Sequence, residues 1–127
     1  MKGLGLVHSI SHMIGAEYNT QHGLTNAIIL PPVMRFNLPH VGEKVRFISD
    51  AMHLKESSSD LVVQEIEQIL DYVDIPKSLS EIGIPLECKK RIAEKAMLDS
   101  ATGTNPRAAQ IEDIENLTEI SILSARA

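Results

Sequence analysis

Three of the five histidines fall within residues 8–23, the segment HSISHMIGAEYNTQHG. His8 and His12 are four residues apart, so on a helix they project from one face, about one turn from each other. His22 follows a turn-forming segment and directly precedes a glycine, where the chain can fold back towards the same space. Imidazole is a ligand for both zinc and iron(II), so the segment indicates a metal site and leaves the metal open.

Two other interpretations of the histidines compete with the metal site. An apolar helix with two histidines four residues apart more often carries two hydrogen-bonded core groups, which taken alone is the favoured interpretation. A self-contained three-histidine zinc hydrolase is the third possibility. A catalytic metal usually has about three or four protein ligands and an open position. Glu17 is the nearest carboxylate and lies on a different helical face from His8 and His12, and no general base is recognisable.

The elements that must position these residues are helices. Residues 2–18 and 24–37 are apolar nearly all round, which predicts two helices buried on all sides. Pro31 and Pro32 are expected to kink the second, because each removes a backbone donor and crowds the preceding turn. Further helices are predicted over residues 41–54, 61–74, 86–98 and 111–123, with a connector of at most one helical turn at 75–85.

Two of the later helices carry apolar stripes at helical spacing. Over residues 61–74 the stripe predicts inward-facing Val62, Ile66, Ile69, Leu70 and Val73, with Glu65, Glu67, Gln68 and Asp71 turned outward. Over residues 111–123 the inward-facing residues are predicted to be Ile111, Ile114, Leu117 and Ile120. No strand-like alternation is visible, so the fold class is all-α: one bundle of about six helices in a single domain, residues 1–127.

Composition limits the function classes. A net charge of −5 and the absence of tryptophan disfavour a nucleic-acid-binding surface. Residues 3–16 and residues 18–34 carry no charged side chain, and each stretch is shorter than the roughly 20 residues needed to span a bilayer. The single cysteine, Cys88, excludes an intramolecular disulfide, and no signal peptide is recognisable. These features predict a cytoplasmic protein without a membrane span.

The segment GLGLVHSISHMIGAEYNTQHGLTNAIILPPVMRFN, residues 3–37, resembles the metal-binding signature of the iron-containing (metal-dependent, group III) alcohol dehydrogenases. That signature runs G-x-x-H-x-x-x-H-x-x-G, then P-H-G, then N-A-I-x-L-P-x-V-M-x-x-N. Residues 75–84, IPKSLSEIGI, and residues 99–117, DSATGTNPRAAQIEDIENL, resemble two later segments of the same family. The resemblance therefore covers essentially the whole chain, as the C-terminal helical domain of the dehydroquinate synthase-like fold.

The resemblance implies a role for each site residue. His8 and His22 correspond to ligands of the catalytic Fe²⁺ or Zn²⁺. His12 corresponds to a residue close to the metal and the nicotinamide that takes part in proton relay, and Ala101 lies where a substrate-pocket side chain is expected. The implied reaction is hydride transfer between a primary alcohol or aldehyde and NAD(P), with the metal as a Lewis acid on the substrate oxygen.

The sequence departs from the family pattern in two ways. Locally, Gln21 replaces the proline of P-H-G, Met13 replaces a proline after the middle histidine, and Pro32 stands where many members have a histidine. More broadly, no glycine-rich phosphate loop and no D-x-x-x-H pair occur, although the family uses that Asp and His to complete the metal site. The chain is therefore expected to carry half a metal site, to bind metal weakly, and neither to bind NAD(P) nor to act as a dehydrogenase alone.

Two expectations about partners follow. The alternative to part of a dehydrogenase is a non-catalytic helical module with a binding or assembly role, which a separate α/β subunit that binds the dinucleotide could complete. The apolar character of the first two helices also predicts a homo-oligomer that buries residues 4–16 of each copy, because large exposed apolar patches are usually interfaces.

Overall fold

The computed structural model describes residues 5–56, 58–99, 102, 103, 105 and 107–126. These residues form six α-helices and no strand, which confirms the all-α prediction. The α-helices are α1 (Gly5–Tyr18), α2 (His22–Asn37), α3 (Gly42–Ala51), α4 (Ser59–Tyr72), α5 (Lys89–Met97) and α6 (Ile111–Ser124). Short 3-10 turns, η2 (Leu38–His40), η3 (Leu79–Ile82) and η4 (Leu86–Cys88), lie between them.

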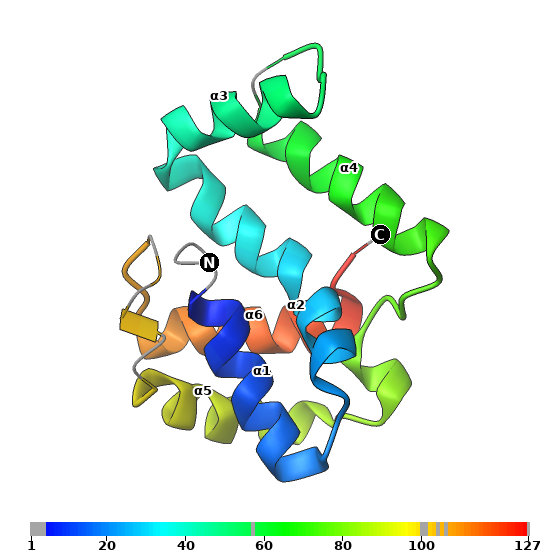
Figure 1. Cartoon of the computed structure of the whole chain (residues 1–127). Helices are drawn as coiled ribbons and strands as arrows, with labels where there is room; N and C mark the ends of the chain where they lie inside the picture. Colours follow the sequence, from blue (N-terminus) through cyan, green and yellow to red (C-terminus); the bar gives the residue numbers. More distant parts are fainter. Residues whose placement is uncertain (1–4, 57, 100–101, 104, 106, 127) are drawn as a thin grey trace.

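The main hydrophobic core lies where α1, α2, α5 and α6 meet (Figure 1). Helix α1 contributes Leu6, Ile10 and Ile14, which recur every four residues and are fully buried. Burying one such side chain stabilises the fold by about 1.5–3 kcal/mol. The opposite face of α1 is exposed, with His8, His12 and Ala16 along it. The prediction that this helix is buried on all sides is therefore wrong for one face, the one that carries the histidines.

Helix α2 begins earlier than the apolar pattern predicts. Gln21 precedes it in an extended conformation, and its side-chain oxygen accepts a hydrogen bond of 2.5 Å from the Leu24 N–H, as an N-cap does. His22 is consequently the first residue of the helix. The helix continues through Pro31 and Pro32 to Asn37 as one element, with both prolines buried.

A second, smaller apolar cluster joins the C-terminal end of α2 to α3 and α4, which pack together at the top of the view in Figure 1. Its buried members are Leu38, Val45, Val62 and Val63. This cluster shares no residue with the main core, so the α3–α4 hairpin is an extension supported chiefly by the end of α2.

The buried stripe of α4 differs from the predicted one. Ile69 and Val73 are each 54% exposed, whereas Glu67 is buried. The stripe follows the rows 62–66–70 and 63–67, and residues 69 and 73 lie outside both rows. Glu67 is accommodated because its carboxylate accepts a hydrogen bond from the Arg35 guanidinium on α2.

The buried stripe of α6 also differs at one position. Ile120 is exposed, while Ile122, Thr118 and Ser121 are buried. The two hydroxyls can be buried because each donates within the helix, Thr118 to the Ile114 carbonyl at 2.7 Å and Ser121 to the Leu117 carbonyl at 2.8 Å. Hydroxyls that bond their own backbone carry no unpaired donor into the core, and a pattern based on apolar residues alone cannot detect them.

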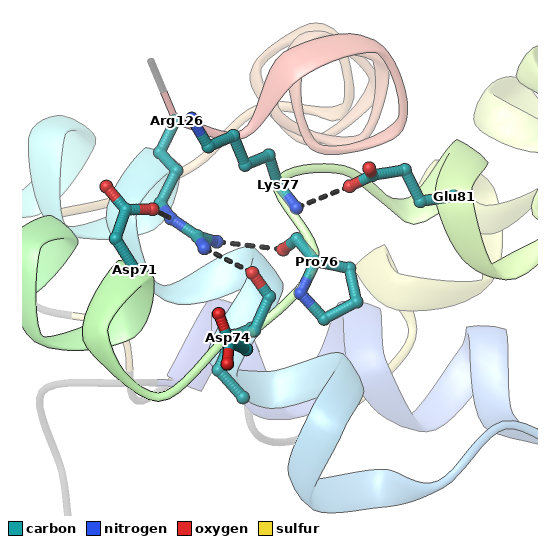
Figure 2. Close-up of a pocket in the computed structure, with 7 residues that line it drawn as sticks. Asp71, Asp74, Pro76, Lys77, Glu81 and Arg126 are labelled. Carbon is teal, nitrogen blue, oxygen red and sulfur yellow. Dashed lines mark hydrogen bonds and ion pairs between the residues drawn. The ribbon is translucent and has the colours of Figure 1, made fainter.

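The C-terminal end is held by Arg126, whose side chain is 1% exposed. Figure 2 shows its guanidinium pointing at the segment between α4 and η3. It donates to Asp71 Oδ1 at 2.8 Å, to the Pro76 carbonyl at 2.8 Å and to the Ile75 carbonyl. Among the described helices, none combines the length and apolar character that crossing a bilayer requires.

Candidate metal centre

The three histidines of residues 8–22 lie on one exposed surface of the molecule. His8 and His12 project from α1, and His22 projects from the first residue of α2. The His8 ring centroid is 5.9 Å from that of His12 and 5.9 Å from that of His22, and the latter pair is nearly perpendicular, at 83°. All three residues are exposed, so the interpretation of them as buried core groups is wrong.

The spacing of the rings fits ligands of one metal ion. Two imidazoles on a tetrahedral metal at about 2.1 Å have ring centroids roughly 5 to 6 Å apart. Both distances from His8 satisfy this, so distance alone does not separate His12 from His22 as the second ligand. Within the described part of the chain, no three His, Cys, Asp or Glu residues form a group that could hold a metal ion. This surface therefore offers at most a partial set of metal ligands among the described residues, and it gives no support to the three-histidine hydrolase.

A buried hydroxyl orients the His22 ring. Ser11 Oγ lies 3.2 Å from His22 Nδ1, and Ser11 is fully buried on α1. If His22 Nδ1 donates to Ser11, Nε2 keeps its lone pair and is available to a metal, which is the usual arrangement around protein-bound metals. Gln21 adds to this order by capping α2 directly before His22. The glutamine in place of the family's proline thus keeps a function at the start of this helix.

Asp99 also lies at the histidine surface, although no local sequence pattern points to it. Its Oδ2 lies 3.4 Å from His12 Nδ1, although 87 residues separate the two in sequence. Asp99 follows the end of α5, and α5 packs along α1, so the fold brings this carboxylate to the histidine surface. Glu17, the carboxylate nearest in sequence, is instead bound by Arg91 Nε at 2.7 Å and Lys95 Nζ at 2.8 Å.

Two side chains of the N-P-R triplet (residues 105–107) in the loop that precedes α6, those of Asn105 and Arg107, contact the helices that carry the histidines. The Asn105 side chain is paired with Asn37 at the end of α2 and accepts a hydrogen bond of 3.4 Å from the Leu6 N–H at the start of α1. The Arg107 guanidinium lies 3.9 Å above the centre of the Phe36 ring and donates to the Phe36 carbonyl at 3.1 Å. Both side chains tie the loop to the helices that carry the histidines. Ala101, the predicted pocket residue in this loop, lies outside the described residues.

An open pocket beside Arg126 is separate from the histidine surface. It is lined by residues of the α4–η3 connector and of the C-terminal end, namely Asp71, Asp74, Ile75, Pro76, Lys77, Glu81 and Arg126 (Figure 2). The guanidinium in its wall is fully engaged with Asp71 and two backbone carbonyls. None of the predicted site residues lines this pocket, and the Arg126–Asp71 pair in it serves to anchor the chain end.

Comparison with known proteins identifies the family. Residues 1–122 match the model of the Fe-containing alcohol dehydrogenase family, C-terminal domain. The chain belongs to this family. The prediction made from the segments around the histidines and the N-P-R triplet is thereby confirmed for the family and for the helical fold of its C-terminal domain.

Curated relatives of the chain in this family are longer proteins. Lactaldehyde reductase of Escherichia coli K12 is 42% identical over 121 residues, covering 91% of this chain and 32% of the relative. NAD-dependent methanol dehydrogenase of Bacillus methanolicus is 36% identical over 123 residues, with the same coverages. The chain thus spans about a third of the length of the curated relatives it matches.

Solved structures show the same arrangement of helices. A 1,3-propanediol oxidoreductase superimposes with a TM-score of 0.87 at 26% identity, over 92% of this chain and 32% of that one. An alcohol dehydrogenase from Oenococcus oeni gives a TM-score of 0.85 at 27% identity, over 94% and 32% respectively. The fold of the chain is therefore that of the helical third of these enzymes.

Proposed function

We propose that this chain supplies the metal-binding helical part of an alcohol dehydrogenase that transfers a hydride between a primary alcohol or aldehyde and NAD(P). The observation that carries the proposal is the convergence of His8, His12 and His22 on one exposed surface, with both neighbours of His8 at 5.9 Å. Imidazoles are costly to bury without partners and serve well as metal ligands when they share a surface.

Each histidine has a distinct task in this proposal. His8 and His22 hold a divalent metal, Fe²⁺ or Zn²⁺, with Ser11 fixing the ring of His22 through Nδ1. The metal, when bound, supplies Lewis acidity to the substrate oxygen. His12 stands beside His8 on the same face of α1 and moves a proton at the same surface.

In this proposal, the dinucleotide-binding site and most of the substrate pocket are formed by residues that do not belong to this chain. The relatives are named for different alcohols and aldehydes, among them lactaldehyde and methanol, which supports small primary alcohols or their aldehydes as the substrate class. The described residues contain no strand–loop–helix unit of the kind that binds a pyrophosphate. We expect no saturable NAD or NADP binding by this chain alone, which calorimetry on the purified chain would measure.

A competing proposal is that the chain is a binding or assembly module that a separate α/β subunit completes. The exposed face of α1, with His8, His12 and Ala16, is the surface such a subunit would cover. A homo-oligomer through residues 4–16 is a further proposal for the same face. Because Leu6, Ile10 and Ile14 are already buried within one chain, only the histidine face of α1 is left for a second copy to cover. Light scattering with and without His12→Glu would detect that interface as a fall to one chain per particle.

The decisive experiment replaces the C-terminal third of E. coli lactaldehyde reductase with this chain. The hybrid is expected to contain stoichiometric divalent metal and to reduce lactaldehyde with NADH or NADPH, and His22→Gln should remove both properties. His53→Gln, an exposed histidine of the α3–α4 hairpin, is the matched control and should change neither. A folded hybrid that holds no metal and has no activity would contradict the proposal.

A further inference from the structure

Asp99 is held in place by the end of α5 and the turn that follows. Its N–H donates to the Ala96 carbonyl at 3.1 Å, and its own carbonyl accepts from the Thr102 N–H at 3.1 Å. The Thr102 hydroxyl adds a bond of 2.6 Å to the Ala96 carbonyl. Ala93 and Ala96 are fully buried in the main core, so α5 lies firmly against α1. The backbone of Asp99 is therefore placed beside α1 without any help from His12.

The two side chains of the His12–Asp99 pair differ in their exposure. The Asp99 side chain is 12% exposed, whereas the His12 side chain is 61% exposed. Because the Asp99 carboxylate is better shielded, its position is the more restricted of the two. The more exposed His12 imidazole has room to rotate, so its orientation is the one that the contact determines. With Nδ1 3.4 Å from Oδ2, the ring turns one nitrogen to Asp99 and leaves Nε2 on the opposite edge.

The chemistry of a carboxylate decides which nitrogen of His12 carries the proton. An ionised carboxylate only accepts hydrogen bonds, so Nδ1 must be the donor and Nε2 must keep its lone pair. We propose that Asp99 is the positioning residue for His12: its carboxylate holds the Nδ1–H tautomer and presents Nε2 as the proton acceptor on the histidine surface.

The consequence for catalysis rests on the proposed function. Nε2 takes a proton from an oxygen acid on the histidine surface, so that the O–H bond breaks and an N–H bond forms. The exposed ring then returns the proton from Nε2 to water. Without Asp99 the neutral ring would prefer the Nε2–H form, as free histidine does, and that form has no lone pair to offer at Nε2.

No other carboxylate is placed for this task among the described residues. The Glu17 carboxylate is occupied by Arg91 and Lys95. The His8 ring, whose centroid is 5.9 Å from that of His12, offers no carboxylate either. Asp99 is thus the group that distinguishes His12 from His8 and His22, the two residues proposed as metal ligands.

The test is long-range ¹H–¹⁵N NMR of the imidazoles in this chain at a pH of about 8.5, well above the ordinary pKa of free histidine. It needs neither metal nor dinucleotide, so its failure is distinct from failure of the proposed function. The His12 signals are assigned by their loss in His12→Gln, and His40 and His53 in the same spectrum provide references on another part of the surface. The expected result in the unsubstituted chain is a majority of the Nδ1–H tautomer at His12.

The matched variants are Asp99→Ala and, as the control, Asp50→Ala on the exposed side of α3. Asp99→Ala should convert His12 to a majority of the Nε2–H form, and Asp50→Ala should leave the tautomer unchanged. A majority of Nε2–H at His12 in the unsubstituted chain would overturn the proposal, and that result does not depend on whether either variant folds. An unchanged tautomer in a folded Asp99→Ala chain would overturn it equally.

Discussion

The side chains of Asn37 and Asn105 are joined by two reciprocal hydrogen bonds in the interior of the protein. Asn37 Nδ2 donates to Asn105 Oδ1 at 2.9 Å, and Asn105 Nδ2 donates to Asn37 Oδ1 at 2.7 Å. The same Asn105 amide group also donates to the Arg107 carbonyl at 2.8 Å. The pair connects the end of α2 to the loop before α6, and through the Leu6 N–H it reaches the start of the histidine-bearing helix.

Replacing Asn105 with alanine should destabilise the fold by about 2–4 kcal/mol, because the Asn37 amide and the Leu6 N–H lose buried partners. Urea unfolding followed by circular dichroism measures the loss. Asn116→Ala on the exposed side of α6 is the matched control and should change stability by less than about 0.5 kcal/mol. Equal losses in the two variants would show that the buried pair contributes nothing specific.

Replacing Arg126 with alanine should lower stability by about 2–4 kcal/mol, since two backbone carbonyls and the Asp71 carboxylate lose their donor. Native-state hydrogen exchange should show the largest effect in the α4–η3 connector and at the end of α6, which this side chain joins. Arg46→Ala, at an exposed position of α3, is the control and should have little effect. Protection that stays unchanged in the connector would contradict the anchoring role.

The stability of the chain should depend on pH through Glu17. Hydrogen bonds from Arg91, and then from Lys95, hold the pKa of this carboxyl below its ordinary value of 4.5. A folded-state pKa lower than the unfolded one adds stability above pH 4.5 that is lost as the pH falls through the lowered folded value. Glu17→Gln should therefore lower the urea midpoint slightly at pH 7, because its cationic partners are about half exposed. The difference in urea midpoint between the unsubstituted chain and Glu17→Gln should disappear in acid. A gap that persists at the lowest pH where the chain is folded would contradict this.

The Cys88 thiol should react slowly in the native protein. It is fully buried in the main core, and burial raises the pKa of the thiol, which lowers the fraction of reactive thiolate. Its reaction with an aromatic disulfide reagent should be at least about 100-fold slower in buffer than in urea, because it requires the main core to open. Comparable rates in the two solvents would show that the core does not shield the thiol.

The positions of the helices could be predicted from the sequence because apolar residues recur in it at regular helical spacing. Which face of each helix is buried was harder to predict. The assignment of Ile69, Val73 and Ile120 to the interior was wrong, since each residue alone satisfies the apolar pattern and only packing decides which row is covered. Glu67 was assigned to the surface for the complementary reason: its buried position depends on Arg35, a partner 32 residues earlier in the chain.

The residues of the candidate site that are close in sequence could be predicted, whereas the one that is distant in sequence could not. His8, His12 and His22 are close in sequence, and the turn before α2 returns the chain to the same surface. Asp99 could not be assigned to His12 from the sequence, because only the packing of α5 on α1 brings them together. Asn105 and Arg107 were visible as part of a family motif, but their partners Asn37 and Phe36 became apparent only in the fold.

The most direct test of the account is a titration of this chain with Zn²⁺, followed through the imidazole NMR signals. The signals of His8 and His22 should move together along one binding curve, with a dissociation constant on the order of 10 μM or weaker, since two ligands alone make an incomplete site. His8→Gln and His22→Gln should each abolish the shift at the remaining histidine, whereas His53→Gln should leave the curve unchanged. Signals of His8 and His22 that do not move, or that move at unrelated metal concentrations, would contradict the claim that these two residues share one metal.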